Sequence, residues 1–138
     1  MVSSQIRELV FKRADYLCEY CRSPLSHSLQ PFDVEHIVPL SKNGSGKLYN
    51  LACSCGGCNG HKYNKTHALD SVSGLIVPLY NPRTMIWYEH YAWSSDFTEM
   101  IGISETGRGT IEALHLNRVG IINVRRLLLL VGLHPPKN

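Results

Sequence analysis

Residues 32–40 read FDVEHIVPL, and this short stretch decides how the chain is interpreted. Most of its residues are apolar and Pro39 ends the run, which predicts a short buried β-strand. Glu35 and His36 stand side by side within it. Neighbouring side chains of a strand point to opposite faces, so both reach one site only at a bulge or at the strand's end. Taken alone, the pair fits a surface glutamate beside a buried histidine, so its meaning depends on the residues around it.

Four of the five cysteines form two CxxC pairs, CEYC with Cys18 and Cys21 and CGGC with Cys55 and Cys58. The pairs are separated by 33 residues, in a chain whose N-terminal segment shows no secretion signal. This arrangement predicts a four-cysteine zinc site, with buried thiols or a redox pair as the alternative. The glycines inside CGGC permit the tight backbone approach that a zinc knuckle requires. We expect the remaining cysteine, Cys53, to be a small buried apolar residue rather than a ligand.

The composition is that of an ordinary globular protein. The chain has 138 residues, 43% of them hydrophobic and 18% charged, enough for one domain with a modest core. Its net charge of +3 permits a nucleic acid as partner without requiring one. The longest apolar run, residues 127–133, is too short to span a bilayer. We therefore expect a soluble, cytoplasmic protein with no membrane partner.

The remaining patterns predict a mixture of helices and strands. The elements that we expect are helices at 4–16, 110–114 and 117–131, strands at 32–40, 48–54, 75–79, 85–93 and 100–103, and a short helix that begins at the second CxxC pair. Arg125 and Arg126 interrupt the apolar pattern of the last helix, and we expect both on its solvent side. The order strand, loop, strand, helix thus follows the first cysteine pair and includes the second.

Two asparagines follow the FDVEHIVPL strand at positions suited to a functional site. Asn50 lies 15 residues after Glu35, and Asn59 directly follows Cys58. An amide oxygen on a rigid knuckle, beside a carboxylate, is a good ligand for a hard divalent ion. We therefore expect the zinc to be structural and Glu35 with Asn59 to hold a second, catalytic ion.

The segment VEHIVPLSKNGSGKLYNLACSCGGCNGHK, residues 34–62, resembles the HNH nuclease family, whose metal-binding core is a ββα unit. The family's pattern is an acidic residue or His before a His, then Asn-Leu, then a cysteine pair followed by Asn or His and a basic residue. In this sequence the pattern falls at Glu35, His36, Asn50, Leu51, Cys55, Cys58, Asn59 and Lys62. The earlier pair, Cys18 and Cys21, is similar to the zinc-stapled branch of the family. Residues 78–93 and 106–118 also look like an extension found in some bacterial members.

The resemblance implies a role for each residue of the pattern. His36 would be the general base that takes a proton from the attacking water, which suits an imidazole because its pKa lies near neutrality. Asn50 would orient His36 or brace the loop that presents it, with a plain turn residue as the alternative. Glu35 and Asn59 would bind one Mg²⁺ or Mn²⁺ ion at the scissile phosphate. The family often has Asp where Glu35 stands, so the ligand arm is one methylene longer here.

The expected fold is α+β, a ββα-metal (HNH) core with a structural zinc, flanked by an N-terminal helix and a C-terminal strand-plus-helix extension. We expect a single HNH nuclease domain over residues 1–138, with its core at about 18–66 and the extension at about 67–138. The implied function is a metal-dependent DNA endonuclease that uses one catalytic ion and leaves 5′-phosphate and 3′-hydroxyl ends. Two alternatives stay open: a zinc-stapled nucleic-acid-binding module that does not cleave, and a four-cysteine structural or protein-interaction domain.

Basic residues near the second cysteine pair are candidates for DNA contact. Lys62 and Lys65 are three residues apart on the expected helix, where they either meet backbone phosphates or form a solvated basic face. We expect His61 to be exposed or to contact phosphate rather than to bind metal. For Arg83, His90 and Arg108 the sequence leaves both a structural role and a role in nucleic-acid binding open. No recognition helix is evident, so DNA binding is expected to be weakly sequence-specific.

Overall fold

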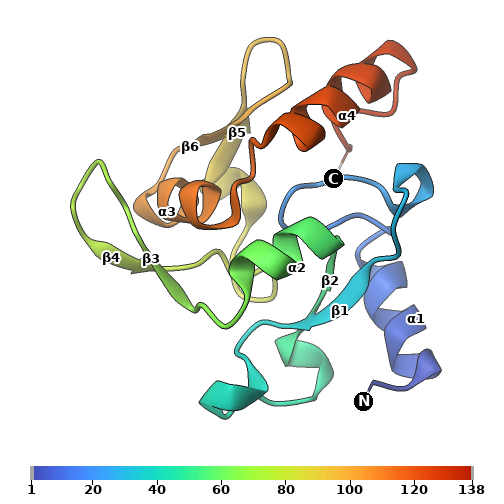
Figure 1. Cartoon of the computed structure of the whole chain (residues 1–138), viewed down its shortest axis with the longest axis vertical. Coiled ribbons are helices and arrows are strands. Elements are labelled where there is room, and N and C mark those ends of the chain that lie inside the picture. The colour runs from blue at the N-terminus through green and yellow to red at the C-terminus, as the bar shows by residue number, and fades with distance from the viewer. Residues whose placement is uncertain (1, 138) are drawn as a thin grey trace. The chain divides into compact units, whose positions relative to one another are not determined.

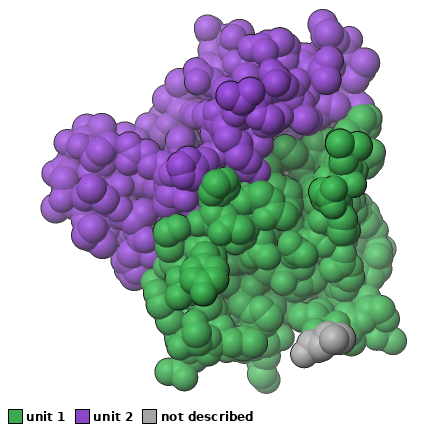
Figure 2. All heavy atoms as spheres, viewed as in Figure 1, with its two compact units in different colours: residues 1–66, 81–85 green, residues 67–80, 86–138 purple. Residues whose placement is uncertain are grey.

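The computed structural model describes residues 2–137 and divides the chain into two compact units. Unit 1 runs to Thr66 and includes Asn81–Met85, whereas unit 2 comprises His67–Tyr80 and the chain from Ile86 onward (Figure 2). No helix within residues 2–137 has both the length and the apolar character needed to cross a membrane.

The centre of unit 1 is an antiparallel hairpin followed by a helix (Figure 1). Strand β1 (Asp33–His36) pairs with β2 (Leu51–Ser54), in a register that places Glu35 opposite Ala52. Helix α2 (Gly56–Lys62) follows β2 almost at once and packs on β1. The order is therefore ββα, as expected from the sequence.

Helix α1 (Ser4–Arg13) packs against both strands of this hairpin. Ser3 caps it, because its hydroxyl accepts a hydrogen bond from the Ile6 N–H at 3.2 Å. At the other end, Arg13 donates to the carbonyl oxygens of Leu48 and Leu51, at 2.9 and 2.5 Å. The helix stops short of the expected 4–16 because the backbone turns left-handed at residues 15 and 16, with φ of 54° and 58°.

The two strands are shorter than expected, because the backbone bends at Ile37 and Val38 after β1 and because one-turn 3₁₀ helices flank the connecting loop. These turns are Leu40–Lys42 after β1 and Leu48–Asn50 before β2. Between them Gly44 lies directly against the carbonyl of Val38, where a Cβ atom would overlap the carbonyl oxygen. The Gly44 N–H also donates to the Pro39 carbonyl at 2.9 Å. Only glycine therefore fits this point of the loop that connects β1 to β2.

Unit 2 contains two antiparallel hairpins and two helices. Its elements are β3 (His67–Leu69) paired with β4 (Ile76–Pro78), β5 (Tyr91–Trp93) paired with β6 (Met100–Gly102), α3 (Glu105–Leu114) and α4 (Val119–Leu130). Helix α3 packs on β3, β4 and β6. Trp87 and Tyr91 are buried, with ring centroids 5.1 Å apart, so aromatic packing supplies part of the core of this unit.

Several expectations about the second half need correction. The strand expected at 85–93 is confined to Tyr91–Trp93, because Trp87–Glu89 forms a 3₁₀ turn. Helix α3 begins at Glu105, not at residue 110, because the Ser104 hydroxyl caps it by accepting from the Gly107 N–H at 2.9 Å.

Arg125 is not on the solvent side of the last helix, where the sequence placed it. Its side chain is 1% exposed and donates to the carbonyl oxygens of Thr98 and Leu116, at 2.9 and 2.8 Å. Arg126 is exposed, as expected. The buried guanidinium thus has a structural role, holding the segment around Thr98 against α4.

Candidate active site

Four cysteines from two distant segments meet at one point of unit 1. The sulfur atoms of Cys18, Cys21, Cys55 and Cys58 all lie within 4.8 Å of one another, and those of Cys21 and Cys55 are 3.8 Å apart. Four thiolates held tetrahedrally at about 2.3 Å from one ion lie about 3.8 Å apart. In each pair the N–H of the second cysteine points at the sulfur of the first, at 3.5 and 3.4 Å. The donor set and its spacing are compatible with a structural zinc.

Cys53 stands outside this cluster, as expected. It is fully buried in β2 and is not among the four cysteines whose sulfur atoms converge. Burial raises the pKa of its thiol to about 12, so it stays neutral at physiological pH.

The first CxxC pair is anchored by a residue that lies far away in sequence. Glu19, between Cys18 and Cys21, forms an ion pair with Arg83 and accepts a hydrogen bond from the Cys53 N–H at 2.9 Å. Arg83 also donates to the Leu51 carbonyl at 3.3 Å. Of the two roles open to Arg83 from the sequence, the contacts fit the structural one.

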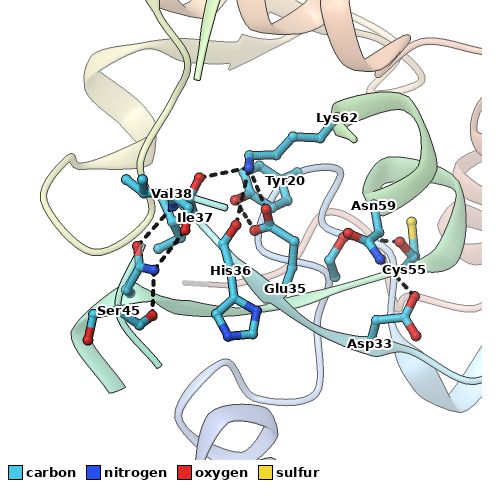
Figure 3. A network of polar contacts seen from close by, with 12 residues as sticks. Tyr20, Asp33, Glu35, His36, Ile37, Val38, Ser45, Cys55, Asn59 and Lys62 are labelled. Carbon is cyan, nitrogen blue, oxygen red and sulfur yellow. Dashed lines mark hydrogen bonds and ion pairs between the residues drawn. The ribbon is translucent and has the colours of Figure 1, made fainter. Parts of the chain in front are cut away.

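Glu35 is buried between β1 and α2 (Figure 3). Its side chain is 3% exposed, with Oε1 2.5 Å from the Lys62 ammonium and Oε2 accepting from the Tyr20 hydroxyl at 2.7 Å. Burial raises the pKa of the Glu35 carboxyl, and the Lys62 ammonium acts in the opposite direction. Both carboxylate oxygens of this residue, expected from the sequence to bind a metal ion, therefore contact protein donors.

Lys62 is buried to the same degree as its partner. Its side chain is 1% exposed, and Nζ also donates to the carbonyl oxygens of Ile37 and His36, at 2.8 and 3.4 Å. The two roles left open for Lys62, contact with DNA phosphates and a solvated basic face, both require an ammonium at the surface, and this one is buried. Lys65 is exposed and stays a candidate for contact with DNA phosphates.

His36 leaves β1 on the other side from Glu35. Figure 3 shows its ring pointing away from the Glu35 carboxylate, as strand alternation requires. His36 lines a hollow of about 410 Å³ together with Ile6 of α1, the two residues before that helix, and Leu40 and Gly46 of the loop after β1. The side chain is half-buried, and no group within residues 2–137 hydrogen-bonds to its ring. A ring nitrogen is therefore available to accept a proton.

Asn50 braces the loop that follows His36. Its Oδ1 accepts from the Val38 N–H at 2.9 Å, and its Nδ2 donates to the carbonyl oxygens of Val38 and Ser45, at 3.0 and 2.7 Å. These partners are backbone groups and not the His36 ring. Of the roles considered from the sequence, the contacts therefore fit the bracing of the loop.

Asn59 reaches from α2 to β1, where its Nδ2 lies 3.3 Å from Oδ2 of Asp33 (Figure 3). Both side chains are partly exposed. Sequence reasoning missed Asp33, because the motif assigns it no position. The alternation of a strand was the available signal, since residues two apart, such as Asp33 and Glu35, point to the same face.

Comparison with known families agrees with this arrangement. A scan against protein-family models matches residues 18–65 to the family described as HNH endonuclease. A search of curated proteins and a search of solved structures each found no match. The matched span contains both cysteine pairs, the β1–β2 hairpin and α2. Residues 18–65 of this chain are thus an HNH endonuclease domain, an α+β unit whose four clustered cysteines are compatible with structural zinc.

Proposed function

We propose that the chain is a metal-dependent DNA endonuclease that hydrolyses phosphodiester bonds. The observation that supports this most directly is the state of His36 within the HNH domain. Its ring is half-buried, accepts and donates no hydrogen bond within residues 2–137, and borders a hollow at the surface. A histidine with only a structural role normally has its ring nitrogens satisfied by hydrogen bonds.

His36 is the general base in this proposal. A ring nitrogen takes the proton of the attacking water, and the Asn50 contacts keep the backbone beyond His36 in one conformation. Lys62 adds to this positioning, because it holds the carbonyl oxygens of His36 and Ile37 from the other side of the strand. The base is therefore fixed at its backbone while its ring stays free to react.

Glu35 and Asn59 are the ligands that we propose for the catalytic Mg²⁺ or Mn²⁺. Carboxylate and amide oxygens form the hard donor set that these ions prefer. Both side chains extend into the space between β1 and α2, where Glu35 contacts Lys62 and Asn59 contacts Asp33. When bound, the ion stabilises negative charge at the scissile phosphate and its leaving oxygen. The four-cysteine cluster has no such role, since four thiolates leave no open coordination position.

DNA is the partner that follows from this activity. Lys65 is exposed just beyond α2 and is the basic residue that we propose to contact backbone phosphates. Such contacts do not read the base sequence, so binding is expected to weaken steeply with salt and to discriminate little between sequences.

A plasmid assay tests the proposal. Zinc-loaded wild-type protein is expected to nick or cut plasmid DNA with Mg²⁺ or Mn²⁺ and to be inactive with a chelator. His36→Ala is expected to lose about 10²–10⁴-fold in rate while it keeps its zinc and its DNA affinity. Binding without cleavage by the wild type, with every divalent ion tried, would instead support the zinc-stapled module that does not cleave. Absence of DNA affinity would support a structural or protein-interaction domain.

A further inference from the structure

We infer that Asp33 is a further ligand of the catalytic ion, next to Asn59. The inference rests on the proposed function and extends it by a carboxylate that the motif does not assign. Three observations support it: the contacts between β1 and α2, the accessibility of the side-chain oxygens, and the ion pairs of the two carboxylates.

The contacts between β1 and α2 form two parallel pairs. Asp33 and Glu35 are two residues apart on the strand and share one face, while Asn59 and Lys62 are three apart and neighbours on the helix. Asp33 meets Asn59 at 3.3 Å, and Glu35 meets Lys62 at 2.5 Å (Figure 3). The carboxylate within direct reach of the Asn59 amide is therefore that of Asp33.

The side-chain oxygens of Asp33 and Asn59 are accessible to a ligand, unlike the carboxylate oxygens of Glu35. Within residues 2–137, Asn59 is the one side chain that hydrogen-bonds to the Asp33 carboxylate, and no donor contacts Oδ1 of Asn59. Both side chains are partly exposed. Glu35 is 3% exposed and has a donor on each oxygen. Because Mg²⁺ usually keeps several waters when it binds to protein, an accessible pair of oxygens suits it best.

The spacing of the Asp33–Asn59 pair also suits one ion. Turning the Asn59 amide by 180° exchanges its oxygen and nitrogen, which occupy nearly the same positions. The amide oxygen then lies next to Oδ2 of Asp33, at a separation near the present 3.3 Å. Adjacent oxygens at about 2.1 Å from an octahedral ion lie about 3 Å apart. The two side chains thus need only a small shift to share a cation.

Charge distinguishes the two carboxylates in the same way. The Glu35 charge is balanced by the Lys62 ammonium at 2.5 Å. Asp33 has no ion-pair partner among residues 2–137. Asp33 is therefore the carboxylate beside Asn59 whose negative charge no ion pair within residues 2–137 balances, and a divalent cation bound there would neutralise it.

Mn²⁺ binding to zinc-loaded protein without DNA, followed by electron paramagnetic resonance, tests this inference independently of activity. Asp33→Asn is expected to weaken Mn²⁺ binding at least about tenfold, since even outer-shell partners of metal ligands typically cost about 10–100-fold. Asn59→Ala is expected to weaken it comparably. Asp15→Asn is the matched control, because Asp15 is exposed, lies in the same unit and has a left-handed φ of 54° that Asn tolerates.

The outcomes separate this inference from the proposed function. Wild-type affinity in Asp33→Asn, together with weakened binding in Asn59→Ala, would overturn the role of Asp33 and leave the catalytic ion in place. Absence of Mn²⁺ binding by the wild type would overturn the ion itself, and Asp33 with it. Zinc content serves as the folding check. Should Asp33→Asn lose its zinc, Asp33→Glu keeps the charge and moves the oxygens, and unchanged affinity there would equally overturn the inference.

Discussion

The ammonium of Lys62 lies 2.5 Å from the carboxylate of Glu35, in a space where neither side chain is more than 3% exposed. The same ammonium holds the carbonyl oxygens of His36 and Ile37. One cation therefore neutralises the carboxylate next to the proposed base and fixes the backbone that carries the base. Removing either partner leaves a buried group without its counterpart, so substitutions in this pair are expected to destabilise the domain.

Lys62→Met is expected to destabilise the domain by about 3–5 kcal/mol, because it leaves the Glu35 charge buried and unpaired. Urea unfolding of the zinc-loaded protein measures the effect. Lys65→Met removes the same charge from an exposed position of the same segment and is expected to change the free energy of unfolding little. The double variant Lys62→Met, Glu35→Gln is expected to regain part of the loss, and equal losses in the single and double variants would contradict the pairing argument.

Zinc is expected to be required for the fold of unit 1. Binding to four cysteines contributes about 10–16 kcal/mol in zinc-finger peptides, as much as or more than the whole stability of a typical domain. Cys55→Ser is therefore expected to yield poorly folded protein, whereas Cys53→Ser, outside the cluster, is expected to be mild. Elemental analysis and circular dichroism check both. Folded wild-type protein that contains no zinc would refute this prediction.

Asn50→Ala is expected to reduce cleavage more than it reduces stability. The substitution leaves the Val38 and Ser45 carbonyls and the Val38 N–H without their partner, at a cost of about 1–3 kcal/mol for a buried group. It also releases the loop beyond His36, so the nicking rate is expected to fall while zinc content is kept. Asn64→Ala, at an exposed position of unit 1, is the control. Nicking at the wild-type rate by Asn50→Ala would show that bracing the loop is dispensable.

Lys65→Ala is expected to weaken DNA binding and to lower the slope of log affinity against log salt by about 1, as loss of one phosphate contact requires. Filter binding at several salt concentrations measures both quantities. The effect is expected to be the same for unrelated DNA sequences. A loss of affinity confined to one sequence would instead point to a base contact.

The stability of unit 2 is expected to fall on acidification through Asp70. Its buried carboxylate accepts two hydrogen bonds from Arg108, at 3.0 and 2.9 Å, and further ones from backbone N–H groups, which hold the pKa of Asp70 well below its usual range. The unfolded chain, with an Asp pKa of about 3.9, binds a proton first as the pH falls. The stabilisation is therefore present above about pH 4 and is lost progressively below it.

Both tryptophans, Trp87 and Trp93, belong to unit 2, so their fluorescence monitors the unit that contains Asp70. Asp70→Asn is expected to lower stability at pH 7 and to flatten its decline below about pH 4. Parallel declines in the wild type and in Asp70→Asn would show that another carboxyl group controls the acid response.

The ββα core was predictable from the sequence because its signals are local. Apolar runs, CxxC spacing and the Asn50 position all fall within one segment. The strands differ from the expectation only at their ends, where a bend after β1 and a 3₁₀ turn before β2 shorten them. Burial of long cationic side chains was not predictable in this way. The partners of these side chains, among them Glu35 for Lys62 and Thr98 for Arg125, lie 27 residues away in each case.

The sequence predicted which residues belong to the candidate site, but it did not predict which of them contact one another. The motif selects Glu35, His36 and Asn59, yet it contains no information on which carboxylate lies opposite the asparagine. That depends on the offset between α2 and β1, which tertiary packing determines. Strand β3 was missed for a related reason: it has three residues, two of them exposed, and it is specified by its pairing with β4 rather than by its own composition.

The segment Asn81–Met85 belongs to unit 1 although unit 2 precedes and follows it in the sequence. Through Arg83 it supplies the counter-charge of Glu19, inside the first cysteine pair. The stretch that matches the HNH family ends at residue 65, so the unit of sequence similarity is smaller than the unit of folding. Recombination that exchanged everything after residue 66 as a cassette would take Arg83 with it. A chimera with a foreign segment after residue 66 is therefore expected to leave Glu19, inside the first cysteine pair, without its counter-charge.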